Sequence, residues 1–221
     1  MTDAPTGPAG QARPAGSVGS VVEAVVFDLG NVLIRWDPMP AVARGVGEDE
    51  AARFLAAEDF DFGDWNHQQD AGREWRAAED AVAASHPHWH PHALAYRAHF
   101  AHSLVGPIEE NVAIVRDLHA AGVPLTALTN WSAELFPHAL ERFDFLALFD
   151  DIVVSGAEGV AKPDPVVFDR LRERVGRPLD RCVFVDDSAA NVEAGAAAGL
   201  DAIRFTGEPL RPQLRERGLP V

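Results

Sequence analysis

The chain has 221 residues and a formal net charge of −15, so it lacks the clustered basic side chains with which proteins bind nucleic acid. No apolar run approaches the ~18 residues that a membrane-spanning helix needs, and residues 1–20 hold no apolar stretch of the kind found in secretory signals. The single cysteine, Cys182, allows no internal disulfide, so we expect a cytoplasmic protein with neither a nucleic-acid nor a membrane partner.

The basic residues are unevenly divided between the two types. Lysine occurs once, at Lys162, and the other 18 of the 19 basic residues are arginine. Coding bias explains arginine at exposed positions, where either residue is accepted. A lysine that persists in such a chain is expected where the planar fork of arginine does not serve.

In chain order, the sequence predicts a tail, a strand and then a block of helices. Residues 1–20 are rich in Pro, Gly and Ala and have almost nothing to bury, so we predict a disordered tail. The run from Val21 to Asp28 is β-branched and stops abruptly at Gly30, as a buried strand does. Residues 38–105 contain no convincing strand and are rich in Ala, Trp, His and acidic residues, which predicts helices.

From residue 106 the pattern alternates between helices and strands, which is typical of a doubly wound parallel sheet. The predicted organisation is an α/β core from residues 21–37 and 106–221, interrupted by a helical insert over 38–105. The expected elements are a helix from Pro107 to Gly122, a strand Val123–Asn130, a helix Ala133–Arg142, a strand Asp151–Ser155, a helix from Asp164 to Gly176, a strand Arg181–Asp187, a helix Ala189–Ala198 and a strand Asp201–Phe205.

Polar side chains follow the predicted strands where each one ends. Because the carboxyl ends of parallel strands meet at one edge of a sheet, these groups should converge there. Carboxylates are hard ligands that favour Mg²⁺, and a carboxylate can also attack phosphorus as a nucleophile. The pattern therefore indicates phosphoryl transfer. The residues are Asp28, Thr129, Asn130, Lys162, Asp186 and Asp187.

Four motifs carry a family resemblance. FDLGNVL, LTNWS, AKPDP and FVDDSAANVEAG occur in this order, at spacings that resemble the four motifs of the haloacid dehalogenase superfamily. DLGNVL followed by a helical insert is most similar to the sugar-phosphate phosphatase branch that includes bacterial α-glucose-1-phosphatase. The resemblance covers about Val21–Phe205 and implies a Rossmann-like core whose inserted helical cap selects the substrate.

The resemblance also implies roles for individual residues. Asp28 would be the nucleophile, and Thr129 would bind a phosphoryl oxygen with Asn130 beside it. Lys162 would neutralise both the nucleophile and the phosphate of the substrate. The implied Mg²⁺ site consists of Asp28, the backbone carbonyl of Gly30, Asp186 and Asp187.

The sequence departs from the family pattern at Gly30. Most phosphatases of the superfamily carry there, two residues after the nucleophile, an Asp that acts as general acid and base. Either the leaving group needs little help, as in an anomeric sugar phosphate or an acyl phosphate, or the insert supplies the proton. His67 and Asp70 in WNHQQDAGR are the candidates, and His67 is also a candidate substrate-binding residue.

The sequence therefore predicts a Mg²⁺-dependent phosphatase that acts on a small phosphorylated metabolite, with a sugar phosphate as one candidate, in a monomer or a homodimer. One alternative is a metal-independent 2-haloacid dehalogenase, against which the Asp186–Asp187 pair argues. Another is a non-catalytic protein that binds phosphate. A phosphomutase would need the Asp that Gly30 replaces.

The insert contains two groups of ring side chains. We expect Trp65, Trp75 and Trp89 in the core of the insert, with an apolar lid over the substrate as the alternative. The histidines of SHPHWHPH are expected in a surface loop rather than a zinc site, because two prolines interrupt the segment and no other zinc pattern accompanies it.

Overall fold

The computed structural model describes residues 22–221, so the predicted tail over residues 1–20 lies outside the described part of the chain. Its centre is a five-stranded sheet of order β5-β4-β1-β6-β7, in which every neighbouring pair is parallel. The predicted doubly wound α/β fold is thereby confirmed. The strands are β1 (Ala24–Phe27), β4 (Leu125–Thr129), β5 (Asp151–Val154), β6 (Cys182–Asp186) and β7 (Asp201–Arg204).

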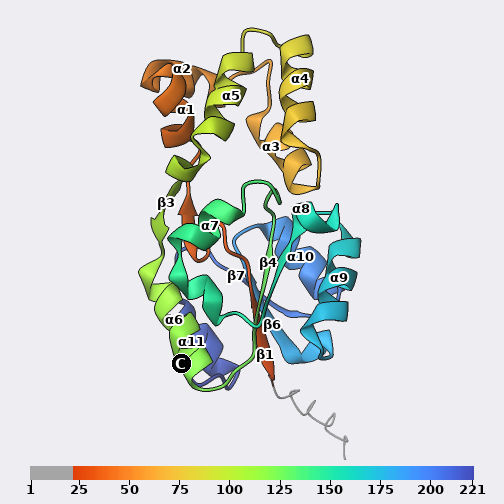
Figure 1. Cartoon of the computed structure of the whole chain (residues 1–221). Helices are drawn as coiled ribbons and strands as arrows, with labels where there is room; N and C mark the ends of the chain where they lie inside the picture. The colour runs from red at the N-terminus through yellow and green to blue at the C-terminus, as the bar shows by residue number, and fades with distance from the viewer. Residues whose placement is uncertain (1–21) are drawn as a thin grey trace, which may run out of the picture.

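Helices lie on both faces of this sheet, with α6 and α11 on one side and α9 and α10 on the other (Figure 1). The core helices are α6 (Glu109–Ala120), α7 (Pro137–Arg142), α8 (Ser155–Glu158), α9 (Pro165–Val175), α10 (Ala189–Ala197) and α11 (Leu210–Glu216), with 3₁₀ turns at η2 (Asp144–Leu148) and η3 (Leu179–Arg181).

The side chains of β1 alternate between two hydrophobic clusters, because successive residues of a strand point to opposite faces of a sheet. Val25 and Phe27 pack in the cluster that includes α6 and α11. Ala24 and Val26 pack in the cluster that includes α9. With both faces covered, the carboxyl edge of the strands is left to form a site.

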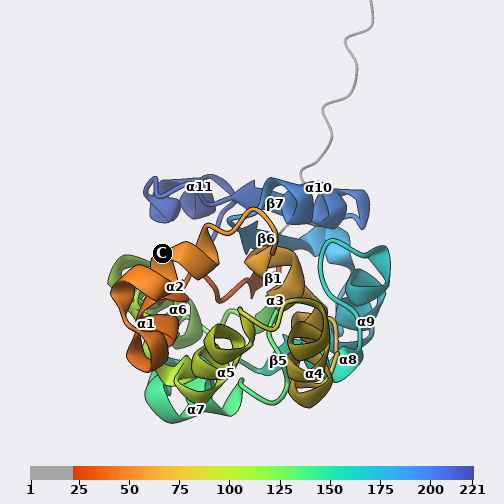
Figure 2. The same ribbon diagram turned by 90° about the horizontal axis from the view of Figure 1, so that it is seen from above.

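Five further helices form a separate layer over that carboxyl edge (Figures 1 and 2). The helices of this layer are α1 (Met39–Val46), α2 (Glu48–Leu55), α3 (Phe62–Asp70), α4 (Trp75–Ser85) and α5 (His90–Ala98), followed by the 3₁₀ turn η1 (Phe100–Ser103).

Within the described residues, no helix is both long and apolar enough to cross a bilayer.

A two-stranded antiparallel ribbon, β2 (Ile34–Trp36) and β3 (Leu104–Pro107), joins the two layers. The sequence did not predict this ribbon. Pro107 was expected to start a helix, but it is the last residue of β3 and pairs with Ile34, and α6 starts at Glu109. Pairing between strands so far apart in the chain leaves no local sequence pattern, which explains the error.

Two further predictions were wrong in part. The helix expected over Ala133–Arg142 begins only at Pro137, because proline is favoured in the first turn, where its missing N–H is not needed. The histidine segment is only half a loop: α5 begins at His90, and the ring of His92 is buried 5.3 Å from that of Phe54.

Candidate active site

The register of the sheet brings the polar strand ends together. Phe27 on β1 pairs with Ala127 on β4 and with Val185 on β6, so the next residue, Asp28, lies level with the ends of both neighbouring strands. Carboxylate oxygens of Asp28, Asp186 and Asp187 lie within 4.8 Å of one another. Across residues 22–221, this is the one cluster of such side chains with the spacing of a metal site.

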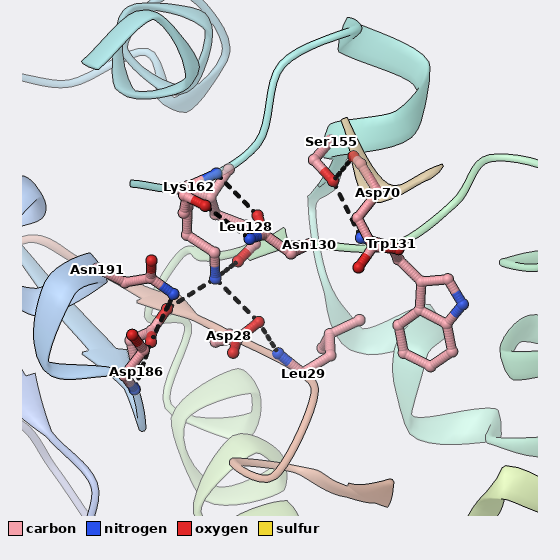
Figure 3. A network of polar contacts seen from close by, with 11 residues as sticks. Asp28, Leu29, Asp70, Leu128, Asn130, Trp131, Ser155, Lys162, Asp186 and Asn191 are labelled. Carbon is pink, nitrogen blue, oxygen red and sulfur yellow. Dashed lines mark hydrogen bonds and ion pairs between the residues drawn. The ribbon is translucent and has the colours of Figure 1, made fainter. Parts of the chain in front are cut away.

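Lys162 is buried between two of these carboxylates (Figure 3). Its Nζ donates hydrogen bonds to Oδ2 of Asp186 and to the carbonyl oxygen of Leu128, both at 2.7 Å, and lies 3.0 Å from Oδ1 of Asp28. Burial alone would lower the pKa of Lys162, but the charges of Asp28 and Asp186 outweigh it and raise the pKa above its usual value. The ammonium group therefore stays charged.

Asp28 is 7% exposed, and burial raises its pKa to about 7. The Lys162 ammonium opposes this rise, whereas the charges of Asp186 and Asp187 add to it. Three carboxylates facing one ammonium leave excess negative charge in a buried site, which a divalent cation would offset. A cluster of hard oxygen donors of this kind fits Mg²⁺.

Thr129 contributes an unpaired hydroxyl at the end of β4. Its Oγ1 is buried and has no hydrogen-bond partner among the described residues. Because buried hydroxyl groups are nearly always hydrogen-bonded, this unpaired hydroxyl indicates a partner outside the described residues, although Thr129 is not among the residues that line the cavity described below.

Two asparagines hold Lys162 and Asp186 in place, one through the backbone and the other through the side chain. Nδ2 of Asn130 donates to the backbone carbonyl oxygen of Lys162, and Oδ1 of Asn130 accepts from the backbone N–H of Lys162, both at 2.8 Å. Nδ2 of Asn191 donates to both oxygens of Asp186, at 3.0 and 3.2 Å. The sequence analysis assigned Asn191 no role. The signal that would have found it is its position in the first turn of the helix after β6, from which a side chain reaches back to the strand end.

A cavity of about 190 Å³ lies between the carboxyl edge of the sheet and the helical layer. Asp28, Gly30 and Asp187 line it from the sheet, and Asp70 lines it from α3. His67, one helical turn before Asp70, is not among the lining residues. Of the two proton donors suggested by the sequence, Asp70 is thus the one that faces the cavity.

Asp70 is the last residue of α3, and its backbone carbonyl accepts a hydrogen bond from Ser155 Oγ in the core (Figure 3). Asn66 Nδ2 donates to Oδ2 of Asp70 at 3.2 Å. Burial raises the pKa of Asp70 to about 7, and the nearby charge of Asp28 acts in the same direction. A carboxyl group with this pKa can hold or release a proton near neutral pH.

The helical layer is tied to the core beside this cavity. Trp75 Nε1 donates to Ser132 Oγ at 2.8 Å, and the backbone N–H of Trp75 donates to Glu134 Oε1 at 2.9 Å. Arg97 on α5 reaches the other oxygen of Glu134 at 2.8 Å. These bonds fix the Trp75 ring, which is buried in the core as predicted and also lines the cavity.

A parallel sheet with acidic and basic side chains gathered at its carboxyl edge is an arrangement typical of α/β enzymes that act on charged ligands. Residues 22–199 match the model of the haloacid dehalogenase-like hydrolases, and the chain belongs to this family. The resemblance inferred from the four motifs, and its prediction of a hydrolase, are therefore confirmed.

The chain is similar to several curated phosphatases. It is 26% identical to a sesquiterpene phosphatase of Aspergillus oryzae, over 83% of this chain and 90% of that protein. It is also 26% identical to a 6-phosphogluconate phosphatase of Escherichia coli, over 52% of each, and 28% identical to a phosphoglycolate phosphatase of Aliivibrio fischeri, over 42% of this chain and 43% of that protein. These matches support the phosphoric monoester hydrolase class within the family.

Solved structures share the fold. A haloacid dehalogenase-family enzyme of Bacteroides thetaiotaomicron, crystallised as a magnesium complex, superposes with a TM-score of 0.69 at 19% identity, over 88% of this chain and 99% of that one. A dehalogenase superposes with a TM-score of 0.63 at 18% identity, over 85% and 86%. At such identities the likeness concerns the fold alone.

Proposed function

We propose that the protein is a Mg²⁺-dependent phosphatase that hydrolyses a small phosphate monoester through an aspartyl-phosphate on Asp28. The observation that carries the proposal is the surroundings of Asp28: a buried ammonium group 3.0 Å away, and the carboxylates of Asp186 and Asp187 within 4.8 Å. The phosphatase relatives, and a solved neighbour that binds magnesium and inorganic phosphate, support it.

In the first step, one carboxylate oxygen of Asp28 attacks phosphorus, an O–P bond forms, and the bond to the ester oxygen breaks. Lys162 and the hydroxyl of Thr129 bind oxygens of the transferred group and stabilise its charge. A Mg²⁺ ion held by Asp28, Asp186, Asp187 and the Gly30 carbonyl would supply positive charge that lowers the pKa of Asp28 and neutralises the phosphoryl oxygens. Water then attacks phosphorus and restores the Asp28 carboxylate.

We assign the proton transfers to Asp70. Its carboxyl group gives a proton to the ester oxygen as the alcohol leaves, and the resulting carboxylate accepts a proton from the water that hydrolyses the aspartyl-phosphate. In this assignment Asp70, from the helical layer, replaces the Asp that the family usually carries at the position of Gly30. Both residues line the same cavity.

We further propose that residues 38–105 act as a cap that closes over the substrate, and that Asn130 positions Lys162 rather than binding substrate. His67 has no place in the catalytic step under this proposal. The protein would act in the cytoplasm on a free small molecule, as a monomer or a homodimer, with no nucleic-acid or membrane partner.

The test is hydrolysis of an aryl phosphate with and without Mg²⁺ by the wild-type chain and by Asp28→Asn. We expect turnover that depends on Mg²⁺ and disappears in the variant. Release of halide from a 2-haloacid without metal would instead identify a dehalogenase. Absence of turnover with every phosphate ester, together with retained phosphate binding, would identify a binding protein.

A further inference from the structure

The cavity above Asp28 has an aromatic wall that draws on both layers of the molecule. One part comes from the ribbon and the helical layer, and the other from the segment after β4. Five aromatic side chains and one leucine form the wall: Trp36, Trp75, Tyr96, Phe100, Trp131 and Leu135. Its polar atoms are the indole N–H groups and the Tyr96 hydroxyl, and the buried indole N–H of Trp131 has no hydrogen-bond partner among the described residues.

Ring contacts and hydrogen bonds hold this wall rigid. The centroids of the Trp75 and Tyr96 rings are 5.7 Å apart, and those of Phe100 and Trp131 are 6.0 Å apart in an edge-on arrangement. The indole N–H of Trp75 is held by Ser132 Oγ. A wall of fixed rings presents a preformed apolar surface to a ligand.

Most polar side chains that line the cavity are already bonded within the protein. Ser132 Oγ accepts from Trp75, and both amide atoms of Asn130 are bound to the backbone of Lys162. Oδ1 of Asn31 accepts from the backbone N–H of Trp36 at 3.1 Å. These atoms are therefore poorly placed to pair with hydroxyl groups of a substrate.

Beyond the phosphoryl site, the helical layer contributes to the cavity Asn66 and Asp70, which are bonded to each other, and the hydroxyl of Tyr96. The proposed function already uses Asp70 at the ester oxygen. A sugar would bring several hydroxyl groups into a cavity with few partners for them, and an unpaired buried hydroxyl is unfavourable. An apolar group would instead exchange water for ring contacts.

From this lining we infer that the substrates are phosphate monoesters of apolar alcohols, whose alkyl, prenyl or aryl group packs against the aromatic wall. The inference rests on the proposed phosphatase function and narrows it. It replaces the sugar phosphate suggested by the sequence with a substrate that carries few polar groups beyond its phosphate.

The test is a series of n-alkyl monophosphates from ethyl to octyl, assayed with Mg²⁺. The leaving alcohols have closely similar basicity, so differences in kcat/KM report contacts of the chain with the cavity. We expect kcat/KM to rise about fourfold for each buried methylene until the wall is covered. Geranyl and naphthyl phosphate should be good substrates, and glucose 6-phosphate should fall at least about tenfold below hexyl phosphate.

The outcomes separate the two claims. Turnover of all esters that is flat with chain length, or highest for the sugar phosphate, while still lost in Asp28→Asn, would overturn the apolar substrate and leave the phosphatase intact. Absence of turnover with every ester would overturn the phosphatase and this inference together.

A variant of the wall gives a second readout. Trp36 lines the cavity and is only partly buried, so Trp36→Gln should fold. We expect the ratio of kcat/KM for hexyl over ethyl phosphate to fall severalfold. Leu94→Gln is the matched control, because Leu94 is 41% exposed on α5 and does not line the cavity. An unchanged ratio in Trp36→Gln would contradict a role of the wall.

Discussion

The side-chain amide of Asn130 binds both backbone polar atoms of Lys162, each at 2.8 Å. Lys162 lies in the loop that follows β5 and α8. The Asn130 bonds fix this loop to the end of β4, the strand that neighbours β5 in the sheet. From this anchored backbone, the buried ammonium group reaches Asp186, Asp28 and the carbonyl of Leu128 at once. The position of the single lysine is thus set at both its backbone and its side-chain end.

Lys162→Arg, which conserves charge, should lower kcat/KM by about 100-fold or more. The larger guanidinium group has no room between two carboxylates that already lie 2.7 and 3.0 Å from Nζ, and its planar geometry does not match their positions. Steady-state kinetics with an aryl phosphate measure the effect. The exposed Arg172→Lys on α9 is the control and should be neutral. Near wild-type turnover of Lys162→Arg would mean that the lone lysine reflects composition alone.

Asp70→Asn should lower kcat/KM for alkyl phosphates by about 10²–10⁴-fold, because their alkoxide leaving groups need a proton. Aryl phosphates, whose leaving groups are more acidic, should lose much less. The pKa of Asp70 is raised to about 7, so its acid form is present below that pH and is lost above it. Wild-type activity on alkyl esters should therefore decline as pH rises through about 7, and the variant should lack this limb.

His67→Ala is the matched control for Asp70→Asn, since His67 lies on the same helix but does not line the cavity. It should leave kcat and the pH profile nearly unchanged. A loss in His67→Ala equal to that in Asp70→Asn would return the histidine to the list of proton donors.

Gly30→Asp should fold and should partly restore activity to Asp70→Asn. Apart from its chain neighbours, no atom of residues 22–221 lies within 4 Å of a Cβ at Gly30, so a side chain fits there, and the residue lines the same cavity. An Asp at this position would stand where most phosphatases of the family carry their acid. We expect the double variant to regain at least about tenfold in kcat/KM for alkyl esters. If the double variant folds and kcat/KM does not rise, proton donation is not what limits the turnover of alkyl esters by Asp70→Asn.

Mg²⁺ should stabilise the protein more at pH 8 than at pH 5. Burial raises the pKa of Asp28 from 3.8 to about 7. Between these two pH values, Asp28 in the folded metal-free protein therefore keeps a proton that it has lost in the unfolded chain. The stability of the metal-free protein therefore falls as pH rises through this window, and the cation offsets the loss when the carboxylates are ionised. Thermal unfolding with Mg²⁺ and with a chelator measures the difference. In the metal-free state, Asp28→Asn should melt higher than wild type, and a lower Tm would contradict this account.

Gly72→Ala should impair closure of the helical layer. Its Cβ would lie 2.9 Å from Cα of Gly159 in the core, in addition to the strain of φ +100°. Gly199→Ala is the matched control: its φ is +105°, but apart from chain neighbours no described atom lies within 4 Å of a Cβ there. Backbone strain should cost each variant about 1–2 kcal/mol of stability, and the close contact with Gly159 should add to the loss in Gly72→Ala. Gly72→Ala alone should lower kcat/KM, by about tenfold or more, and equal kinetics in the two variants would exclude a role for this contact.

Local sequence patterns predicted the α/β core and the edge of its sheet at which the polar residues gather. Alternating and β-branched runs marked the strands, and prolines and glycines marked most of the helix ends, because these preferences act over a few neighbouring residues. Asp28 and Asp186 stand at the ends of strands, and Lys162 follows a strand just before a helix begins, so the pattern predicts that all three meet at one edge of the sheet. The distances of 2.7 and 3.0 Å agree with that expectation.

Which residues of the insert face the site depends on how its helices pack against the core. His67 and Asp70 are three residues apart on one helix, yet just Asp70 lines the cavity, because that depends on how α3 docks against the core. The pairing of Ile34 with Pro107 joins residues far apart in the chain, as does the wall that combines Trp36 with Trp131. Such contacts arise from packing between distant segments, which neither local propensity nor spacing along the chain encodes.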